Sequence, residues 1–284
     1  MYQISAEDTL GLNDSQVALV RKVIALEPMP VDERIADRIY PGSETNQPGR
    51  IRTQVFTGEK VSRITAYRFH REGLLNEHLF HAWPAPGYDF PALTTVLFER
   101  PDMVILGADL LPIADVAFDR TYYGRWMLEF ADLLAQFWPE LIEHRLGAEP
   151  APDPYFTNQI GSTTSVLLYL DTDVIPTAVR FLNELTELWI TLHDRAQPRT
   201  DEMAADVDRR RVQLMTKAYK GLDYHSPASD SLAAVMGWPG ANLQFDSVFG
   251  PDVPAGTLDS KRTYLDMVVS PGTVSAGRTR TRNE

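Results

Sequence analysis

Short connections between apolar runs are the feature of this sequence that most restricts its fold. Alternating, extended runs occupy residues 50–57, 60–70, 74–83, 93–98 and 103–111, and only turns or a short proline-rich segment join them. A parallel crossover needs about a dozen residues or more, so runs joined this closely must pair in antiparallel fashion. The sequence therefore predicts an antiparallel meander.

The hydrophobic pattern on either side of this meander is that of helices. A first helix is expected over residues 13–26, with Asp14 or Ser15 as its N-cap, and residues 27–49 are expected to be irregular. Beyond the meander we expect a sixth strand over residues 163–170 and helices over residues 122–141 (kinked or divided at Pro139), 176–193, 201–221 and 229–236.

Because most helices follow the strands and do not alternate with them, the fold class is expected to be α+β. We predict one domain over residues 1–270, an α/β/α sandwich whose central antiparallel sheet is covered by helices on both faces. Residues 271–284 include the basic run RTRTR with polar residues beside it and are expected to form a flexible tail.

Composition narrows the classes of partner. The chain has 39 acidic and 27 basic residues, a net charge of −12, which disfavours nucleic acid and anionic membranes as partners. It has no cysteine, which excludes disulfides, thiolate nucleophiles and cysteine-bound metal clusters. The N-terminus lacks the pattern of a signal peptide and no apolar run is long enough to span a bilayer, so we expect a cytoplasmic protein.

Motifs for common cofactors are missing from the sequence. There is no glycine-rich dinucleotide fingerprint, no P-loop, no zincin motif and no nucleophile elbow. His78 and His81 are three residues apart in an expected strand, which places them on opposite faces. A shared metal site is therefore not expected.

Asp109 is the most informative polar residue, because it interrupts the apolar run Met103–Leu111. A carboxylate within a sheet is costly unless it is hydrogen-bonded, paired or protonated. One interpretation is an aspartate at the end of a strand that faces solvent or caps the turn before Pro112. The other is a proton donor whose pKa is raised by a dry pocket.

At this point the sequence resembles the ferredoxin-dependent bilin reductases, which share a fold with red chlorophyll catabolite reductase. Similar elements occur in the family's order between about residues 50 and 250. They are Trp83-Pro84-Ala85-Pro86-Gly87-Tyr88-Asp89-Phe90-Pro91, then Ala108-Asp109-Leu110-Leu111-Pro112, then Asp153-Pro154-Tyr155-Phe156-Thr157, and finally Tyr224, Leu232, Gly237, Phe245 and Phe249.

The resemblance implies a linear tetrapyrrole bound between the sheet and the C-terminal helices. It implies no bound metal or flavin, with single electrons from reduced ferredoxin and protons from the protein. Asp109 matches the family's central catalytic aspartate. Leu79 stands where several members have a histidine or asparagine. By strand alternation His81 is expected on the same face as Leu79, so His81 is the preferred second proton donor. A one-residue bulge in the strand would bring His78 to that face instead.

Other positions depart from the family pattern. Tyr67 falls where some members have a catalytic glutamate, and Ser226 falls near a C-terminal catalytic aspartate, with Asp223 and Asp230 close by in the chain. Cations for the pigment's propionates are expected among Arg50, Arg52, Arg63 and Arg68, or these residues form a solvated strand face. A basic stripe, Arg209 to Arg211 with Lys217 and Lys220, is a candidate docking surface for ferredoxin or an ordinary exposed helix face.

The function predicted from these residues is the reduction of a biliverdin-like tetrapyrrole by successive electron and proton transfers. Because several donor positions are altered, two alternatives stay open. One is a protein that binds a tetrapyrrole without reacting with it. The other is a reductase of a chlorophyll catabolite or another conjugated heterocycle on the same fold.

Overall fold

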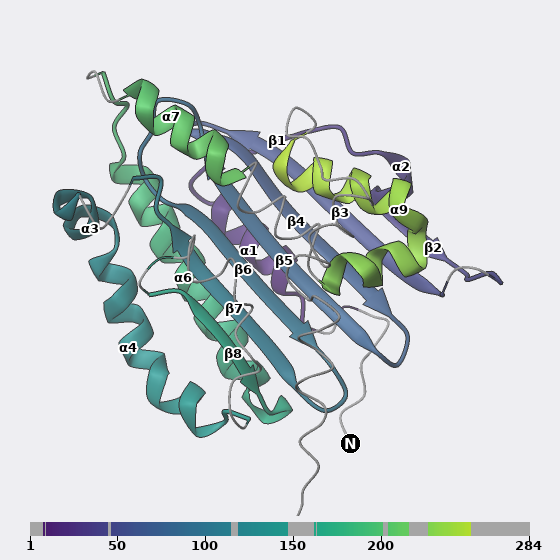
Figure 1. The fold of residues 1–284 in the computed structure, drawn as a ribbon. Coiled ribbons are helices and arrows are strands. Elements are labelled where there is room, and N and C mark those ends of the chain that lie inside the picture. Colours follow the sequence, from purple (N-terminus) through teal and green to yellow (C-terminus); the bar gives the residue numbers. More distant parts are fainter. Residues whose placement is uncertain are drawn as a thin grey trace, which may run out of the picture.

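The computed structural model describes residues 8, 10–44, 47–114, 119–146, 162, 164–200, 204–215 and 227–250. At its centre lies an eight-stranded sheet in the order β1-β3-β4-β5-β6-β7-β8, with β2 also paired to β3 (Figure 1). Every pairing within it is antiparallel. The strands are β1 (Glu27–Pro28), β2 (Asp37–Tyr40), β3 (Gly49–Gly58), β4 (Val61–Arg71), β5 (Leu75–Pro84), β6 (Ala92–Glu99), β7 (Val104–Leu111) and β8 (Val166–Leu170).

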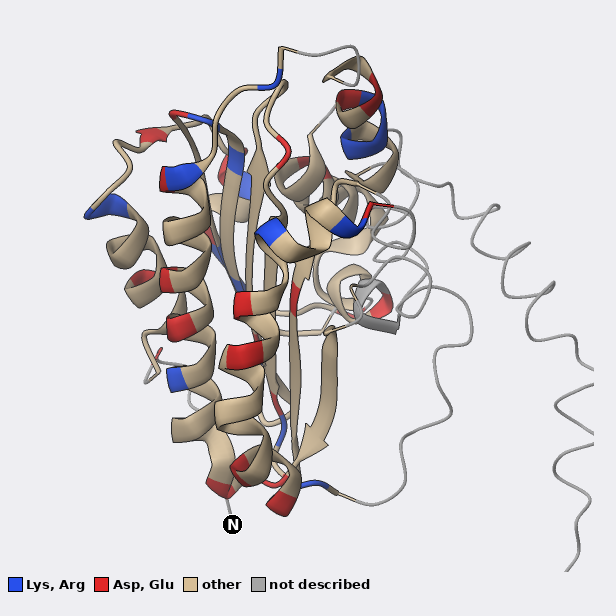
Figure 2. Cartoon of the chain, turned by 90° about the vertical axis from the view of Figure 1, so that its left-hand side faces the viewer, with Lys and Arg blue, Asp and Glu red and all other residues tan. Residues whose placement is uncertain are grey.

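Helices cover both faces of this sheet, as Figure 2 shows with the sheet seen nearly edge-on. They are α1 (Leu12–Arg21), α2 (Glu33–Ala36), α3 (Arg120–Trp126), α4 (Leu128–Glu143), α6 (Ile175–Arg195), α7 (Ala204–Gln213) and α9 (Pro227–Phe249), with a 3-10 turn at Thr172–Val174. The predicted α+β sandwich is confirmed, including the meander from β3 to β7. No helix within the described ranges is long and apolar enough to cross a membrane.

Strand alternation divides the core into two clusters. On β7, Leu106, Ala108 and Leu110 pack in the cluster formed with α1, α4 and α6. Leu111 belongs instead to the cluster formed with α9, which also contains Ile51, Tyr67 and Leu79. Since successive side chains of a strand point to opposite faces, Asp109 lies on the α9 face.

Several predicted boundaries were wrong. Residues 27–49, expected to be irregular, contain β1, α2 and β2, whose edge pairing to β3 involves segments too short to show alternation. The first helix begins after Gly11, which adopts φ 57° and caps it without a side-chain hydrogen bond, so neither Asp14 nor Ser15 is the N-cap. Pro139 lies inside α4, and the division falls at Met127.

The C-terminal helix is longer than the predicted residues 229–236. It continues to Phe249 across a kink at Gly237, where φ is 69° and ψ is 165°. The positive φ explains why a glycine occupies this position. Its second half brings Phe245, Val248 and Phe249 onto the sheet.

Gly49 fixes how closely α9 approaches β3. A Cβ atom at this position would lie 2.9 Å from the carbonyl oxygen of His70 and 3.0 Å from a methyl carbon of Val235 in α9. We expect Gly49→Ala to lower the free energy of unfolding by about 1–3 kcal/mol, the usual cost of overpacking. Denaturant unfolding measures this, with Gly124→Ala as the control, since a Cβ there meets no described atom within 4 Å. Equal stability of the two variants would contradict the close approach.

Candidate active site

Four polar side chains form one row across the α9 face of the sheet. The strand register pairs Thr65 of β4 with His81 of β5, His81 with Thr94 of β6, and Thr94 with Asp109 of β7. All four are buried. Neighbouring strands lie about 4.8 Å apart, so His81 and Asp109 are separated by about 10 Å, with Thr94 between them.

Asp109 is held in a dry setting, with only 2% of its surface exposed. The backbone N–H of Ser162 donates to its Oδ2 at 2.7 Å, and the Ser162 hydroxyl donates to its Oδ1. Burial raises the pKa of Asp109 from 3.8 to about 6, although both hydrogen bonds from Ser162 act to lower it. A group with this pKa exchanges a proton readily near neutral pH.

His81 lies under the end of α9. Its ring is stacked on Trp83 at 6.3 Å between centroids and lies 5.9 Å from the ring of Phe249. Burial lowers the pKa of His81 from 6.5 to about 3, so the imidazole is neutral at ordinary pH. It can donate or accept one hydrogen bond but does not carry a positive charge.

Beside Asp109 the α9 face of β6, β7 and β8 is apolar, and the described part of the chain covers it incompletely. The register aligns Val96, Gly107 and Leu167 in one row and Phe98, Ile105 and Tyr169 in the next. We call these six residues the apolar platform. Leu167 is 42% exposed and the other five are half-buried. On the reverse face of the same strands, Leu97, Leu106 and Leu168 are buried in the α6 cluster.

Besides His81, three predicted residues share this face with Asp109. Tyr67 and Leu79 are directly paired between β4 and β5, and both are buried in the α9 cluster. Arg63 also points toward α9, where its Nη1 donates to the carbonyl oxygen of Ser247 at 2.8 Å. The predicted separation of the two histidines is confirmed, with His81 on the face of Asp109.

His78 and Arg68 are corrections to the predicted site, because both lie on the opposite face, toward α1. The pairing of β5 with β6 has no bulge that would turn His78 over. His78 Nε2 lies 3.4 Å from Glu99 Oε1, and Arg68 Nε donates to Asn76 Oδ1 at 2.8 Å. Neither side chain can reach a ligand beside Asp109.

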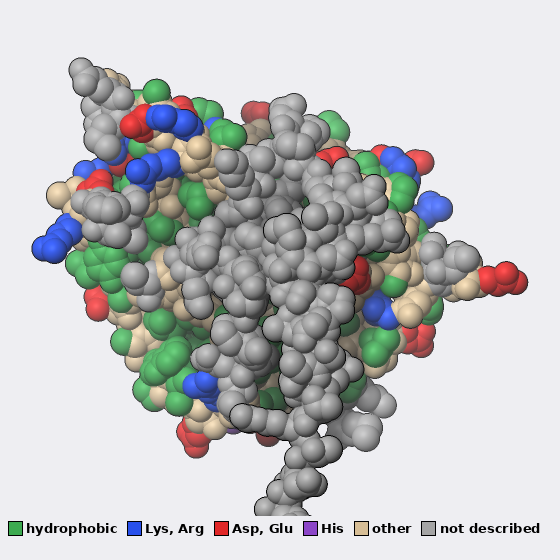
Figure 3. All heavy atoms as spheres, viewed as in Figure 1, with side chains coloured by type: hydrophobic (Ala, Val, Ile, Leu, Met, Phe, Trp, Pro, Cys, Tyr) green, Lys and Arg blue, Asp and Glu red, His purple; other side chains and the backbone are tan. Residues whose placement is uncertain are grey.

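Four of the other predicted cations pair with carboxylates away from Asp109. Arg50 pairs with Asp37 of β2, and Arg52 pairs with Asp14 of α1. On α7, Arg209 pairs with Asp206 and Arg211 lies 3.9 Å from Asp208, so the predicted basic stripe is partly neutralised. In Figure 3, lysine and arginine side chains (blue) lie at the upper left of the view, where Figure 1 places α7.

The C-terminal candidates are only partly described. Asp230 is exposed in the first turn of α9. Ser226 and Asp223 lie outside the described residues, as do Lys217 and Lys220. Sequence reasoning missed Ser162, the partner of Asp109. Its only signal is a run of hydroxyl residues, Ser162 to Ser165, before β8, and nothing in that run indicates which strand it meets.

Comparison with known proteins supports the fold. No model of a protein family matches the sequence, and no curated protein sequence matches it. Among solved structures, selenomethionine-labelled phytochromobilin synthase from tomato, in complex with biliverdin, is similar with a TM-score of 0.70. The alignment covers 91% of this chain and 87% of the tomato chain at 16% identity. The chain therefore shares the fold of that protein.

The raised pKa of Asp109 predicts a pH-dependent stability. Between its unfolded value of 3.8 and its folded value of about 6, the unfolded chain loses a proton that the folded chain keeps. The free energy of unfolding should thus fall by about 3 kcal/mol as pH rises through this window, relative to the Asp109→Asn variant. Denaturant unfolding at a series of pH values measures the difference.

The matched control is Asp102→Asn, which changes a carboxylate in the turn before β7 whose side chain is 64% exposed. Its stability should run parallel to that of the wild type across the same pH range. If the stability of Asp109→Asn also ran parallel to that of the wild type over this pH range, Asp109 would ionise as readily in the folded as in the unfolded chain.

Proposed function

We propose that this protein binds a linear tetrapyrrole over the apolar platform and reduces it, with Asp109 as the proton donor. The observation that carries the proposal is a buried carboxyl group with a raised pKa at the edge of an incompletely covered apolar surface. An exposed apolar surface of this kind is typical of ligand sites. The shared fold with the biliverdin-bound phytochromobilin synthase supports the same ligand class.

The reaction balances as the addition of two electrons and two protons across one double bond of the pigment. In this proposal reduced ferredoxin supplies the electrons singly, and the transfer does not pass through a metal or flavin held by the protein. Each electron adds negative charge to a pigment in a site of low dielectric, which is unfavourable unless a proton follows. Asp109 gives the first proton to the reduced pigment, and the carboxylate that forms accepts hydrogen bonds from Ser162. Solvent then reprotonates Asp109, which gives the second proton after the second electron arrives.

His81 has a different role in this proposal. Because burial keeps its imidazole neutral, His81 acts as a hydrogen-bonding partner of the pigment or of a proton in transit. Arg63, on the same face, is the remaining candidate among the four strand arginines for a propionate. Its guanidinium is already anchored to the end of α9 at Ser247, which would fix its direction.

A tetrapyrrole-binding protein without reductase activity is the second candidate. Tyr67 and Leu79, which occupy positions where reductases of the resembled family carry catalytic side chains, form a buried pair. Leu79 has no proton to give. Binding alone would still use the apolar platform, and electrons would then leave the pigment unchanged.

The reaction is tested by adding biliverdin to the wild type and to the Asp109→Asn variant. Added biliverdin should change its absorption spectrum on binding, and reduced ferredoxin under anaerobic conditions should then convert it to a reduced product. Asp109→Asn should bind the pigment with little change and slow turnover by about a hundredfold or more, the usual contribution of general acid catalysis. Asp102→Asn, in the exposed turn, should behave as the wild type.

Each other outcome has a defined meaning. A spectral change on binding with no effect of electrons favours the binding protein. Failure to bind biliverdin ends the proposal for this pigment, and a panel of other conjugated heterocycles then tests the third alternative. Undiminished turnover in Asp109→Asn would remove Asp109 from the mechanism.

A substitution at Gly107 tests whether the pigment lies on the apolar platform. A Cβ here would meet only Val96 among the described residues, at 3.4 Å, so no described side chain requires a glycine. A glycine within a strand often marks the close approach of a ligand. We expect Gly107→Val to weaken biliverdin binding by about tenfold or more, measured by absorbance titration, with no loss of thermal stability. Unchanged affinity would place the pigment elsewhere.

A further inference from the structure

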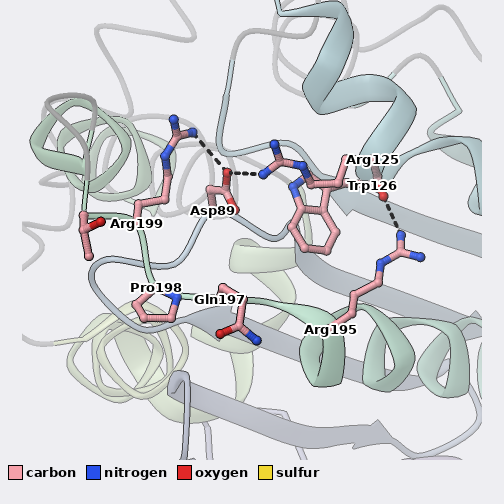
Figure 4. A pocket seen from close by; sticks show the side chains of 8 residues that line it. Asp89, Arg125, Trp126, Arg195, Gln197, Pro198 and Arg199 are labelled. Carbon is pink, nitrogen blue, oxygen red and sulfur yellow. Dashed lines mark hydrogen bonds and ion pairs between the residues drawn. The ribbon is translucent and has the colours of Figure 1, made fainter.

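A pocket of about 490 Å³ lies where the connection between β5 and β6 meets α3 and the end of α6. Its polar lining includes Asp89, Arg125, Trp126, Arg195, Gln197 and Arg199 (Figure 4). Trp126 and its neighbour Phe90 belong to the α6 cluster, whereas Asp109 faces α9. The pocket is therefore separate from the candidate active site.

Arginine side chains dominate this pocket. The buried Asp89 carboxylate, 3% exposed, lies 3.4 Å from Arg125 Nη1 and 3.1 Å from Arg199 Nη1, so one negative charge is shared by two cations. The third cation, Arg195, pairs with Glu129 of α4. Three guanidinium groups thus border the pocket, each held in an ion pair with a carboxylate, and Arg199 also interacts electrostatically with Asp119.

The backbone holds these side chains in place. The N–H of Arg199 donates to the carbonyl oxygen of Gly87 at 2.7 Å, and the N–H of Gly87 donates to Asp208 Oδ1 of α7 at 2.8 Å. These bonds tie the segment after α6 to the β5–β6 connection. Arg199 and Asp89 are thereby positioned before any ligand arrives, which reduces the entropy cost of binding.

Trp126 supplies a hydrogen-bond donor that no described residue of the chain accepts. The guanidinium carbons of Arg125 and Arg195 lie 5.8 and 5.3 Å from its ring, as Figure 4 shows with the indole between the two arginines. Its Nε1 is buried and has no hydrogen-bond partner within the described part of the chain. A buried donor left unpaired is unfavourable, typically by about 1–3 kcal/mol.

We propose that this pocket binds a small molecule through a carboxylate or phosphate group. The oxyanion would accept hydrogen bonds from Arg125, Arg195 or Arg199, whose planar forks match such groups, and from Trp126 Nε1. The volume is in the range of small-molecule sites. This proposal does not depend on the tetrapyrrole reaction.

The test follows the indole N–H resonance of Trp126 in ¹⁵N-labelled protein, assigned by its absence from Trp126→Phe. Inorganic phosphate and citrate are titrated separately at constant ionic strength. We expect at least one of them to move this resonance in a saturable manner. Arg125→Gln, a change at a side chain that is 54% exposed, should weaken the binding by about tenfold.

Arg180→Gln is the matched control. Arg180 of α6 also pairs with a glutamate of α4, Glu140, and its guanidinium carbon lies 5.0 Å from the ring of Phe137, but it does not line the pocket. This variant should bind as the wild type does. A response to phosphate or citrate no larger than the response to chloride overturns the proposal, and so does equal weakening by Arg125→Gln and Arg180→Gln. A response to only one anion identifies the group that is recognised.

Discussion

The unbroken antiparallel register from β4 to β7 is the constraint on which the candidate site depends. It places Thr65, His81, Thr94 and Asp109 on one row of one face. The period of a strand is two residues, so a shift of one residue would turn Asp109 into the α6 cluster and bring Ala108 to its place. The irregularity in β4 falls between Val61 and Arg63, before the row begins, and leaves the register of the site intact.

The meander was predictable because its links are too short for any other pairing. The separation of His78 and His81 onto opposite faces was predictable for a different reason, because alternation within β5 needs no knowledge of the neighbouring strands. The alignment of His81 with Asp109 was not, because it depends on two registers that turns alone do not fix. Ser162 and Asp109 are 53 residues apart in the sequence, and no periodic pattern predicts such a contact. The edge strands β1 and β2 were missed because two to four residues carry no measurable alternation.

The two faces of the sheet differ in a way that core packing does not explain. Leu97, Leu106 and Leu168 are buried beneath α6, whereas the platform side chains directly behind them on the α9 face remain half-buried or exposed. Complete burial of each large apolar side chain contributes about 1.5–3 kcal/mol. On the α9 face the described residues leave part of this stabilisation unused, and a carboxyl group is also buried there. Both features lower the stability of the folded state at the same place. Such features are typical of functional sites.

The two titratable groups of the row respond to burial in opposite directions, and both responses favour the uncharged form. The pKa of Asp109 is raised to about 6 and the pKa of His81 is lowered to about 3. Between pH 3 and pH 6, therefore, neither of these two groups carries a charge. At pH 7 about a tenth of Asp109 is protonated, by its pKa alone. An apolar pigment laid on the platform would exclude water further and so raise this pKa again, since desolvation is its dominant cause. Ligand binding would in this way supply Asp109 with the proton that the proposed reduction consumes. The negative charge of each arriving electron would also raise the pKa of Asp109.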